Sequence, residues 1–234
     1  VAVSLIYKKG KFIKAGTRGD GEQGEDITHN VKTIKQIPLT LKGTNHPNEI
    51  EIRGEIFCEK KAFDKFNNDY SKSDQKTFAN PRNFVAGSIR QLNPEIAAAR
   101  PLKIQLHSLG YVDKNNFFKS HQEMLNIFLS WNLPINPDIK LVDSIEDVLS
   151  YCEKLTKKRE ALNYEIDGVV IKVDNSSIQE ELGYSARSPK WSIAKKFKAE
   201  EGTTEVLSVN FQMGRTGTLT PVANLKPVKL GGVT

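Results

Sequence analysis

Hydrophobic and polar residues alternate along several stretches of the chain, and this period of two predicts β-strands. The clearest stretches are residues 1–7, 11–17, 49–58 and 103–112. Lys9-Gly10 supplies a turn between the first two, so they are expected to form a hairpin. Two further strands are predicted at residues 164–173 and 191–197, which contain compact apolar runs.

Other stretches carry the pattern of amphipathic helices. Helices are expected at residues 60–70 and 82–92, the second entered through Pro81 and ended by Asn93-Pro94. Two more are expected to start at the capping sequences Ser120-x-x-Glu123 and Ser144-x-x-Asp147. Their apolar residues recur at helical spacing, so we interpret both helices as scaffold without a chemical role.

The pattern of predicted elements changes near residue 200. Beyond it, short strand-like stretches are separated by turns at Gly214, Gly217 and Gly231, as in a small all-β domain. We therefore predict two domains, residues 1–200 and residues 201–234. The mixture of helices and strands predicts an α+β fold for the first domain.

Composition narrows the class of protein. With 234 residues, 38% of them hydrophobic, the chain can bury a sizeable core, and its net charge of +6 favours an anionic partner. A long apolar run and a signal-peptide pattern are both missing, so we expect no membrane partner and no secretion. The two cysteines, Cys58 and Cys152, are isolated from each other, so the sequence supports neither a zinc site nor a disulfide framework. A reducing, cytoplasmic setting is therefore expected.

Five short motifs combine glycines with charged residues in a fixed order. They are Thr17-Arg18-Gly19-Asp20-Gly21, Arg53-Gly54-Glu55, Phe78-Ala79-Asn80-Pro81-Arg82-Asn83 with Ala86-Gly87-Ser88, Asp167-Gly168-Val169-Val170-Ile171-Lys172, and Lys195-Lys196-Phe197. Each alone is weak, because such sequences are common in turns and strands. In this order and spacing they resemble the adenylation domain of NAD⁺-dependent DNA ligases. Residues 211–217 and 220–223 resemble the start of the oligonucleotide-binding domain of that family.

The resemblance implies a fold and an activity. The fold is a nucleotidyltransferase domain with mainly antiparallel sheets and flanking helices, followed by the beginning of an all-β OB-fold. Such ligases transfer AMP from NAD⁺ to their own lysine, pass it to a DNA 5′-phosphate and seal the nick during replication and repair, with Mg²⁺ or Mn²⁺. The implied partners are NAD⁺ or AMP and nicked duplex DNA, and a cytoplasmic monomer is expected. Because each step is a substitution at phosphorus, Arg and Lys are the residues of most interest.

The resemblance assigns five residues to the nucleotide pocket: Arg18, Glu55, His107, Lys172 and Lys196. Lys196 is expected against the phosphate of the adenylate and Lys172 near its phosphate or base. Glu55 is expected to accept hydrogen bonds from ribose hydroxyls, and Arg18 to grip phosphate or ribose. His107 stands where the family commonly has a tyrosine that stacks on adenine, which a histidine ring can also do. Without the motifs, the two lysines would be interpreted as solvent-facing strand residues, Glu55 as a member of a cross-strand ion pair and Arg18 as an exposed loop residue.

Five further residues are candidates. Val170 is assigned to the same pocket. Asp167 and Glu165 are interpreted as groups that hold the divalent ion or position the lysines, or else as a chance acidic pair on a strand. Arg82 and Arg90 lie eight residues apart on the predicted helix, about two turns, so they are expected to present one cationic stripe to DNA phosphates. Structural arginines on a helix surface are the alternative.

The nucleophilic lysine is expected outside this sequence. In the family a Lys-x-Asp-Gly motif directly precedes the strand that begins here, so its glycine would stand just before Val1. The chain is expected to be a fragment, since Val1 follows no methionine and residues 228–234 stop in a strand-like run. Lys198 replaces the proline that usually follows the Lys-Phe pair in the family, which frees the local backbone.

Two alternatives to such a ligase remain open at this point. One is an ATP-dependent ligase or an RNA-capping nucleotidyltransferase, against which the motifs at residues 78–88 and 211–217 count. The other is a noncatalytic module that binds DNA through a basic surface and the start of an oligonucleotide-binding fold. That module explains the net charge but not Glu55, Lys172 and Lys196.

Overall fold

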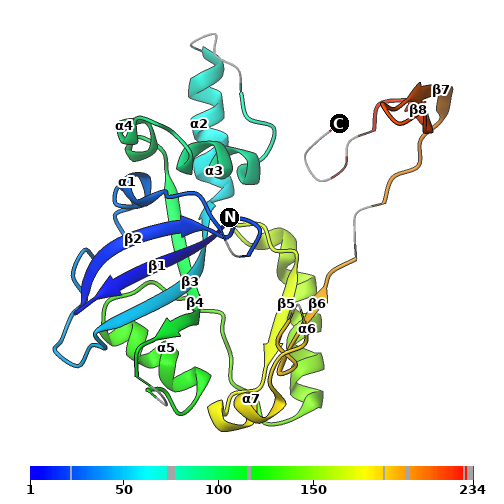
Figure 1. Ribbon diagram of the computed structural model, residues 1–234. Helices are drawn as coiled ribbons and strands as arrows, with labels where there is room; N and C mark the ends of the chain where they lie inside the picture. The colour runs from blue at the N-terminus through cyan, green and yellow to red at the C-terminus, as the bar shows by residue number, and fades with distance from the viewer. Residues whose placement is uncertain are drawn as a thin grey trace. The chain divides into compact units, whose positions relative to one another are not determined.

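Figure 1 shows a computed structural model of the chain. It describes residues 1–21, 23–72, 77–114, 117–186, 188–198, 201–228, 230 and 234. These residues divide into two compact units, Val1–Phe197 and Lys198–Thr234. Helices and antiparallel sheets both occur, so the prediction of an α+β fold is confirmed.

A four-stranded antiparallel sheet forms the centre of the first unit. Its strands are β1 (Ala2–Lys8), β2 (Lys11–Thr17), β3 (Glu49–Cys58) and β4 (Leu102–Val112), in the order β2-β1-β3-β4. The predicted hairpin of β1 and β2 is confirmed. Lys9 and Gly10 make its turn with φ angles of 49° and 74°. The first is unusual for a residue with a side chain and marks a tight connection.

One face of this sheet is buried. Leu5, Ile52, Ile56, Ile104 and Leu106 are each 0% exposed, and they alternate along three strands. They share one hydrophobic core with residues of α1 (Thr28–Val31), α3 (Pro81–Ile89) and α5 (His121–Ser130). Burial of each such side chain stabilises the fold by about 1.5–3 kcal/mol.

The opposite face of the sheet is polar and only partly buried. Successive side chains of a strand point to opposite faces, so Glu51, Arg53 and Glu55 of β3 share this face. Gln105 and His107 of β4 alternate with buried residues in the same way. This face is therefore free of the core and available to a ligand.

The helices depart from the expectation after Ile89. The predicted helix at residues 82–92 ends there, as α3, and Asn93-Pro94 opens a further helix, α4 (Pro94–Ala98). The prediction that Asn93-Pro94 closes a helix is therefore wrong. The Asn93 side chain accepts a hydrogen bond from the backbone N–H of Glu95, and Pro94 occupies the first turn, both of which start a helix.

Both predicted capping sequences start helices, namely α5 and α6 (Ile145–Lys158), the second continued by η1 (Arg159–Ala161). The Ser120 and Ser144 hydroxyls accept hydrogen bonds from the backbone N–H groups of Glu123 and Asp147. The Glu123 carboxylate accepts from the Lys119 N–H and not from the Ser120 N–H, so that capping box is only half formed.

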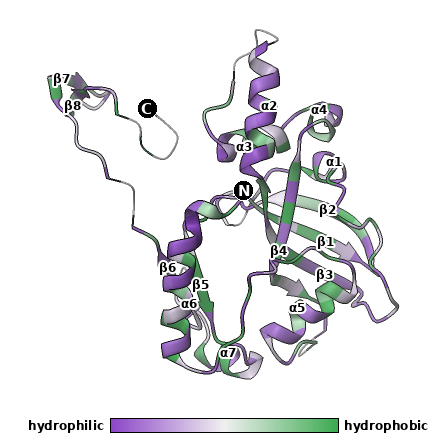
Figure 2. Cartoon of the chain, turned by 180° about the vertical axis from the view of Figure 1, so that it is seen from behind, coloured by the Kyte–Doolittle hydropathy of each residue, from purple (hydrophilic) through white to green (hydrophobic). Residues whose placement is uncertain are grey.

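Two of the longer helices are surface helices. α2 (Lys60–Lys72) and much of α6 are hydrophilic in Figure 2, and each buries one residue, Phe63 and Cys152 respectively. Their place in the fold therefore depends on a narrow apolar stripe.

A second, two-stranded antiparallel sheet consists of β5 (Gly168–Lys172) and β6 (Ser192–Lys196), with α7 (Ser176–Leu182) between them in the sequence. Both strands are shorter than predicted. Glu165 and Asp167 precede β5, so the prediction of an acidic pair on a strand is wrong. The Tyr164 ring packs against Phe57, with centroids 5.5 Å apart, and holds this segment against β3 instead of in a sheet.

In its described residues the second unit contains an antiparallel hairpin, β7 (Val206–Met213) with β8 (Leu219–Leu225). The predicted turn at Gly214 and Gly217 is confirmed: Gly217 donates to the Gly214 oxygen and has a φ of 82°. The turn predicted at Gly231 lies outside the described residues. Within the described ranges, no helix combines the length and the apolar character needed to cross a membrane.

Candidate functional site

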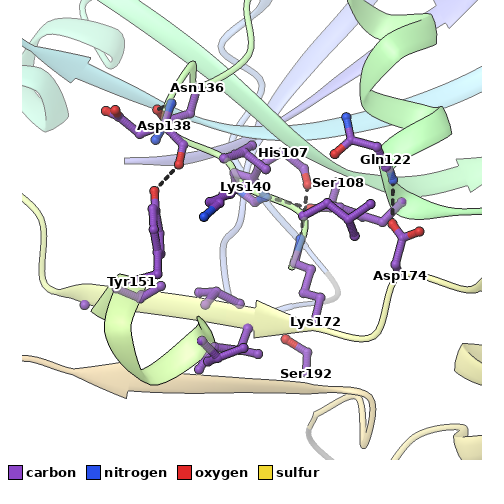
Figure 3. Close-up of a pocket in the computed structure, with 18 of the residues that line it drawn as sticks. His107, Ser108, Gln122, Asn136, Asp138, Lys140, Tyr151, Lys172, Asp174 and Ser192 are labelled. Carbon is purple, nitrogen blue, oxygen red and sulfur yellow. Dashed lines mark hydrogen bonds between the residues drawn. The ribbon is translucent and has the colours of Figure 1, made fainter. Parts of the chain in front are cut away.

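The polar face of the four-stranded sheet borders a cavity of about 900 Å³. Its lining comes from β3 and β4 on one side and from β5 on the other, with further residues from α6 and from residues 136–142 (Figure 3). The cavity therefore lies between two sheets that are far apart in the sequence. Its volume is within the range of small-molecule sites, about 300–1,000 Å³.

The structure brings together only some of the predicted site residues. Glu55, His107, Val170 and Lys172 line the cavity. The remaining candidates are not part of its lining: Arg18, Arg82, Arg90, Glu165, Asp167 and Lys196.

Lys172, at the end of β5, reaches across the cavity. Its Nζ donates a hydrogen bond to the backbone oxygen of His107 on β4, at 3.1 Å (Figure 3). Burial lowers the pKa of Lys172 to about 8, from an ordinary value of 10.5. The side chain is therefore still mainly a cation at neutral pH, but a poorly solvated one that an entering anion would stabilise.

The His107 ring is neutral at neutral pH. Burial, and then the charge of Lys172, lower the pKa of His107 to about 4, although Glu55 opposes this. Its Nδ1 lies 2.8 Å from the Ser108 hydroxyl, which fixes the ring. A neutral, fixed ring can stack on a flat base. His121 lines the same cavity, and burial followed by the charge of Lys172 also lowers its pKa to about 4.

Glu55 and Arg53 extend from β3 on the cavity side. The Glu55 side chain is 52% exposed. Arg53 also lines the cavity, and its Nε lies 2.8 Å from Oε1 of Glu51. Burial opposes the ionisation of Glu51, but hydrogen bonds from Ser4 and Arg53 outweigh it and hold the pKa of Glu51 below its usual value. Arg53 has no role in the sequence-based prediction, although its spacing of two from Glu55 places both on one face.

The pairing of β5 with β6 puts Lys172 and Lys196 on one face of their sheet. Lys172 pairs with Ser192 and Lys196 with Gly168, and directly opposed residues of an antiparallel pair share a face. Along the strand direction the two lysines stand about 13 Å apart, since Lys196 is opposite Gly168 and a strand rises about 3.3 Å per residue. Val170 lies between them on the same face and is 58% exposed. Lys196 is exposed, beyond the lining of the cavity.

Arg18 belongs to a tight loop after β2 and is exposed. Gly19 has a φ of 53°, and a Cβ there would lie 1.6 Å from the backbone oxygen of Gln23, so no other residue fits without rebuilding the loop. The Thr17 hydroxyl accepts a hydrogen bond from the Glu25 N–H at 2.9 Å and closes the loop at its base. The glycine therefore shapes this loop, but the loop does not bring Arg18 into the cavity lining.

Arg82 and Arg90 do not form the predicted stripe. α3 ends before Arg90, whose backbone has left the helix with φ −103° and ψ 11°. The Arg82 Nη1 lies 4.0 Å from Oδ2 of Asp167, and the Arg90 Nε lies 2.7 Å from Oε2 of Glu25. Both arginines are exposed and face carboxylates of different segments, so the prediction that one helix presents them together is wrong.

A group around Asp138 lines another side of the cavity (Figure 3). The Tyr151 hydroxyl donates to the backbone oxygen of Asp138, and the Tyr164 hydroxyl donates to its Oδ2 at 3.0 Å. Burial raises the pKa of both tyrosines. These residues were not predicted, because no periodicity or motif links positions that meet only in the folded chain.

The described residues do not form a metal cage of their own. In those ranges, no three His, Cys, Asp or Glu side chains are grouped as metal ligands. Asp167 is 86% exposed and faces Arg82. Mg²⁺ is often held by one or two carboxylates together with phosphates of a substrate. These residues therefore do not fit a site built from protein ligands alone.

Comparison with known families agrees with this arrangement of a nucleotide-sized cavity in an α+β unit followed by a β-hairpin unit. Residues 1–200 match the family model described as NAD-dependent DNA ligase adenylation domain. Residues 203–234 match the model described as NAD-dependent DNA ligase OB-fold domain. The first unit is thus of the adenylation-domain class. The chain as a whole belongs to the NAD-dependent DNA ligase family.

Individual relatives carry the same description. Proteins named DNA ligase from three Coxiella burnetii strains, Dugway 5J108-111, RSA 331 / Henzerling II and CbuK_Q154, are each 47% identical over 234 residues. The match covers 100% of this chain and 35% of each relative. The chain therefore spans about a third of the length of the curated relatives it matches.

Proposed function

We propose that this chain forms the AMP-binding core of an enzyme that seals nicks in duplex DNA during replication and repair. AMP passes from NAD⁺ to a lysine encoded before Val1, then to a DNA 5′-phosphate, and is lost when the nick closes. Family membership supports this reaction, and the relatives are named DNA ligase.

The observation that supports the proposal most is that two walls, the four-stranded sheet and the two-stranded sheet, contribute residues to one cavity. Glu55 and His107 come from the four-stranded sheet and Lys172 from the two-stranded sheet. A flat ring suits a base, a carboxylate suits ribose hydroxyls, and a poorly solvated cation suits a phosphate. Transfer at phosphorus depends mainly on such positioning and charge stabilisation.

Within this cavity we propose that adenine stacks on His107 beside Val170 and that Glu55 holds the ribose. Lys172 contacts the base or phosphate. Lys196, about 13 Å further along the same sheet face at about 3.3 Å per residue, meets the phosphate at the rim. Arg18 contacts phosphate or ribose from its loop.

We propose that Arg82 and Arg90 contact DNA. Both are exposed, and the chain carries a net charge of +6, which favours binding to a polyanion. We propose the division into an adenylation domain at residues 1–200 and part of an OB-fold domain at residues 201–234. A monomer in the bacterial cytoplasm, where the chromosome lies, completes the proposal.

A divalent ion, Mg²⁺ or Mn²⁺, belongs to the proposed reaction, where it would neutralise phosphate charge. Asp167 and Glu165 lie next to β5 and are the carboxylates we propose as its additional ligands. The described residues do not build a site without the substrate phosphates, so we assign the ion no further role.

Labelling with NAD⁺ that carries a radioactive adenylate group tests the proposal. The full-length protein should form a covalent AMP adduct from NAD⁺ and seal a nicked duplex, and Lys196→Ala should lose most of both activities. Labelling from ATP alone would overturn the choice of NAD⁺. DNA binding without any adduct would support a noncatalytic module instead.

A further inference from the structure

We propose that Asn30 and Glu25 are positioning residues that hold Arg90 in place for the sealing step. The inference rests on the proposed function, in which Arg90 contacts a DNA phosphate. Glu25 ends the loop that carries Arg18, and Asn30 lies in α1 directly after it. Neither residue lines the cavity, so a nucleotide there does not account for their contacts.

Asn30 fixes the backbone on both sides of Arg90. Its Nδ2 donates to the backbone oxygens of Ile89 and Gln91, each at 2.8 Å. Two carbonyl acceptors require the amino group at this position, because a flipped amide would set oxygen against oxygen. Asn30 is 5% exposed, and in the described part of the chain its Oδ1 has no hydrogen-bond partner. The side chain is therefore held by the two bonds that it donates.

These two bonds also determine where α3 ends. The last carbonyls of a helix lack an intrahelical donor, and the Ile89 oxygen is one of them. Asn30, on another segment, supplies the missing donor to the Ile89 oxygen and also donates to the Gln91 oxygen. Arg90 lies between Ile89 and Gln91, and its backbone is no longer helical. The Arg90 side chain is therefore attached to a stretch of backbone that Asn30 fixes.

Glu25 orients the guanidinium of the same arginine. Its Oε2 lies 2.7 Å from the Arg90 Nε, a charge-assisted contact. An exposed ion pair contributes little to stability, so its main consequence is orientation. The contact through Nε does not use the two terminal nitrogens, with which an arginine grips a phosphate. Thr17 holds Glu25 in turn, through the Glu25 N–H at 2.9 Å and the Glu25 oxygen at 3.0 Å.

The test separates the sealing step from adenylation. The full-length protein is given nicked DNA that already carries a 5′-adenylate, and single-turnover sealing is compared with self-adenylation by NAD⁺. We expect Arg90→Ala and Asn30→Ala to slow sealing about tenfold to a hundredfold, and Glu25→Ala less, with self-adenylation by the last two variants unchanged. Each double variant with Arg90→Ala should seal no more slowly than Arg90→Ala alone, because Asn30 and Glu25 act through Arg90.

Asn67→Ala is the matched control. Asn67 also holds the backbone through two side-chain hydrogen bonds, donating to the Phe78 oxygen at 2.8 Å and accepting from the Phe78 N–H at 3.1 Å, but Phe78 does not flank Arg90. It should leave the ratio of sealing to adenylation unchanged. Glu25→Ala, at the surface, keeps the test decisive if Asn30→Ala fails to fold.

The outcomes distinguish the two proposals. Normal sealing by Arg90→Ala would overturn the proposed DNA contact. Slow sealing by Arg90→Ala together with normal sealing by Asn30→Ala and Glu25→Ala would overturn only the positioning role. Equal loss of sealing and adenylation in Asn30→Ala, or additive losses in the double variants, would also overturn it.

Discussion

The two walls of the cavity are built in opposite ways. On the four-stranded sheet, Leu5, Ile52 and Ile56 are 0% exposed and belong to a continuous core. On the two-stranded sheet, none of the residues of β5 and β6 is buried, and Val170 and Ile193 are 58% and 68% exposed. The four-stranded sheet is therefore anchored through its buried face, whereas the two-stranded sheet is thin and carries Lys172 and Lys196 on one face.

This difference teaches that stability and ligand chemistry are largely separated in this unit. A substitution behind the first wall should act on folding, while one on the second wall should act on binding. The predictions that follow challenge this separation, beginning with the largest expected effect.

Ile52→Ala should lower the free energy of unfolding by about 2–5 kcal/mol, because it leaves a cavity in the core. Ile193→Ala, at a site that is 68% exposed on β6, should change it by no more than about 0.5 kcal/mol. Urea unfolding of the chain, followed by circular dichroism, measures both. Similar losses would show that the second wall is as much a part of the scaffold as the first.

Lys172→Met should weaken AMP binding by about 1.5–3 kcal/mol, the usual contribution of a hydrogen bond to a charged group. Its free energy of unfolding should not fall, because a partly buried cation is replaced by an apolar chain of similar length. The pKa of Lys172 is lowered to about 8, so AMP affinity of the unchanged chain should decrease as the pH rises through 8. Calorimetric titration at several pH values, with Lys172→Met as the pH-insensitive control, measures this. A flat profile in both would remove Lys172 from the binding site.

Acid should destabilise the first unit through His107 and His121. Burial lowers the pKa of both to about 4, against 6.5 in an unfolded chain. Between these values the unfolded chain binds more protons, so the free energy of unfolding should fall as the pH drops from 6.5 to 4, by up to about 3 kcal/mol for each histidine at about 1.4 kcal/mol per pKa unit. Urea unfolding across this pH range is the measurement. His107→Gln with His121→Gln should flatten the dependence; an unchanged slope would assign it to other groups.

Arg53→Met should have the smallest effect, less than about 1 kcal/mol of stability, because the Arg53 pair with Glu51 is partly exposed. It should nevertheless raise the pKa of Glu51, which loses one of the two hydrogen bonds that lower it. Carboxyl NMR titration detects such a change. Ser4→Ala is the matched comparison, since it removes the other bond from Ser4 at 2.7 Å.

The strands of the first wall were predictable because their pattern and their packing agree. Period-two alternation in β3 matches its alternating burial, residue by residue. The helix at residues 82–92 was overextended, because its local pattern continues past Ile89 while its end depends on the Asn30 side chain, 59 positions earlier. The start of β5 was misplaced for a similar reason, since Tyr164 packs on Phe57.

The candidate site was predictable only where a motif marks it. Glu55, His107 and Lys172 were assigned by resemblance, and all three line one cavity. Asp138 and Tyr151 were not, because their meeting depends on how α6 approaches residues 136–142, which no local pattern encodes. The ion pairs of Arg82 and Arg90 were equally hidden, since each partner lies on another segment.

The hydrogen bond from Lys172 to the His107 carbonyl makes ligand binding an exchange. A ligand atom that engages Lys172 competes with a peptide oxygen at 3.1 Å, so the net gain is the difference between two acceptors. An anionic ligand oxygen binds Lys172 more strongly than the His107 oxygen does, whereas a neutral ligand oxygen gains little free energy from the exchange. The same bond also links the two sheets, since Lys172 belongs to β5 and His107 to β4. A ligand that binds Lys172 in place of the His107 oxygen must therefore link the two sheets itself.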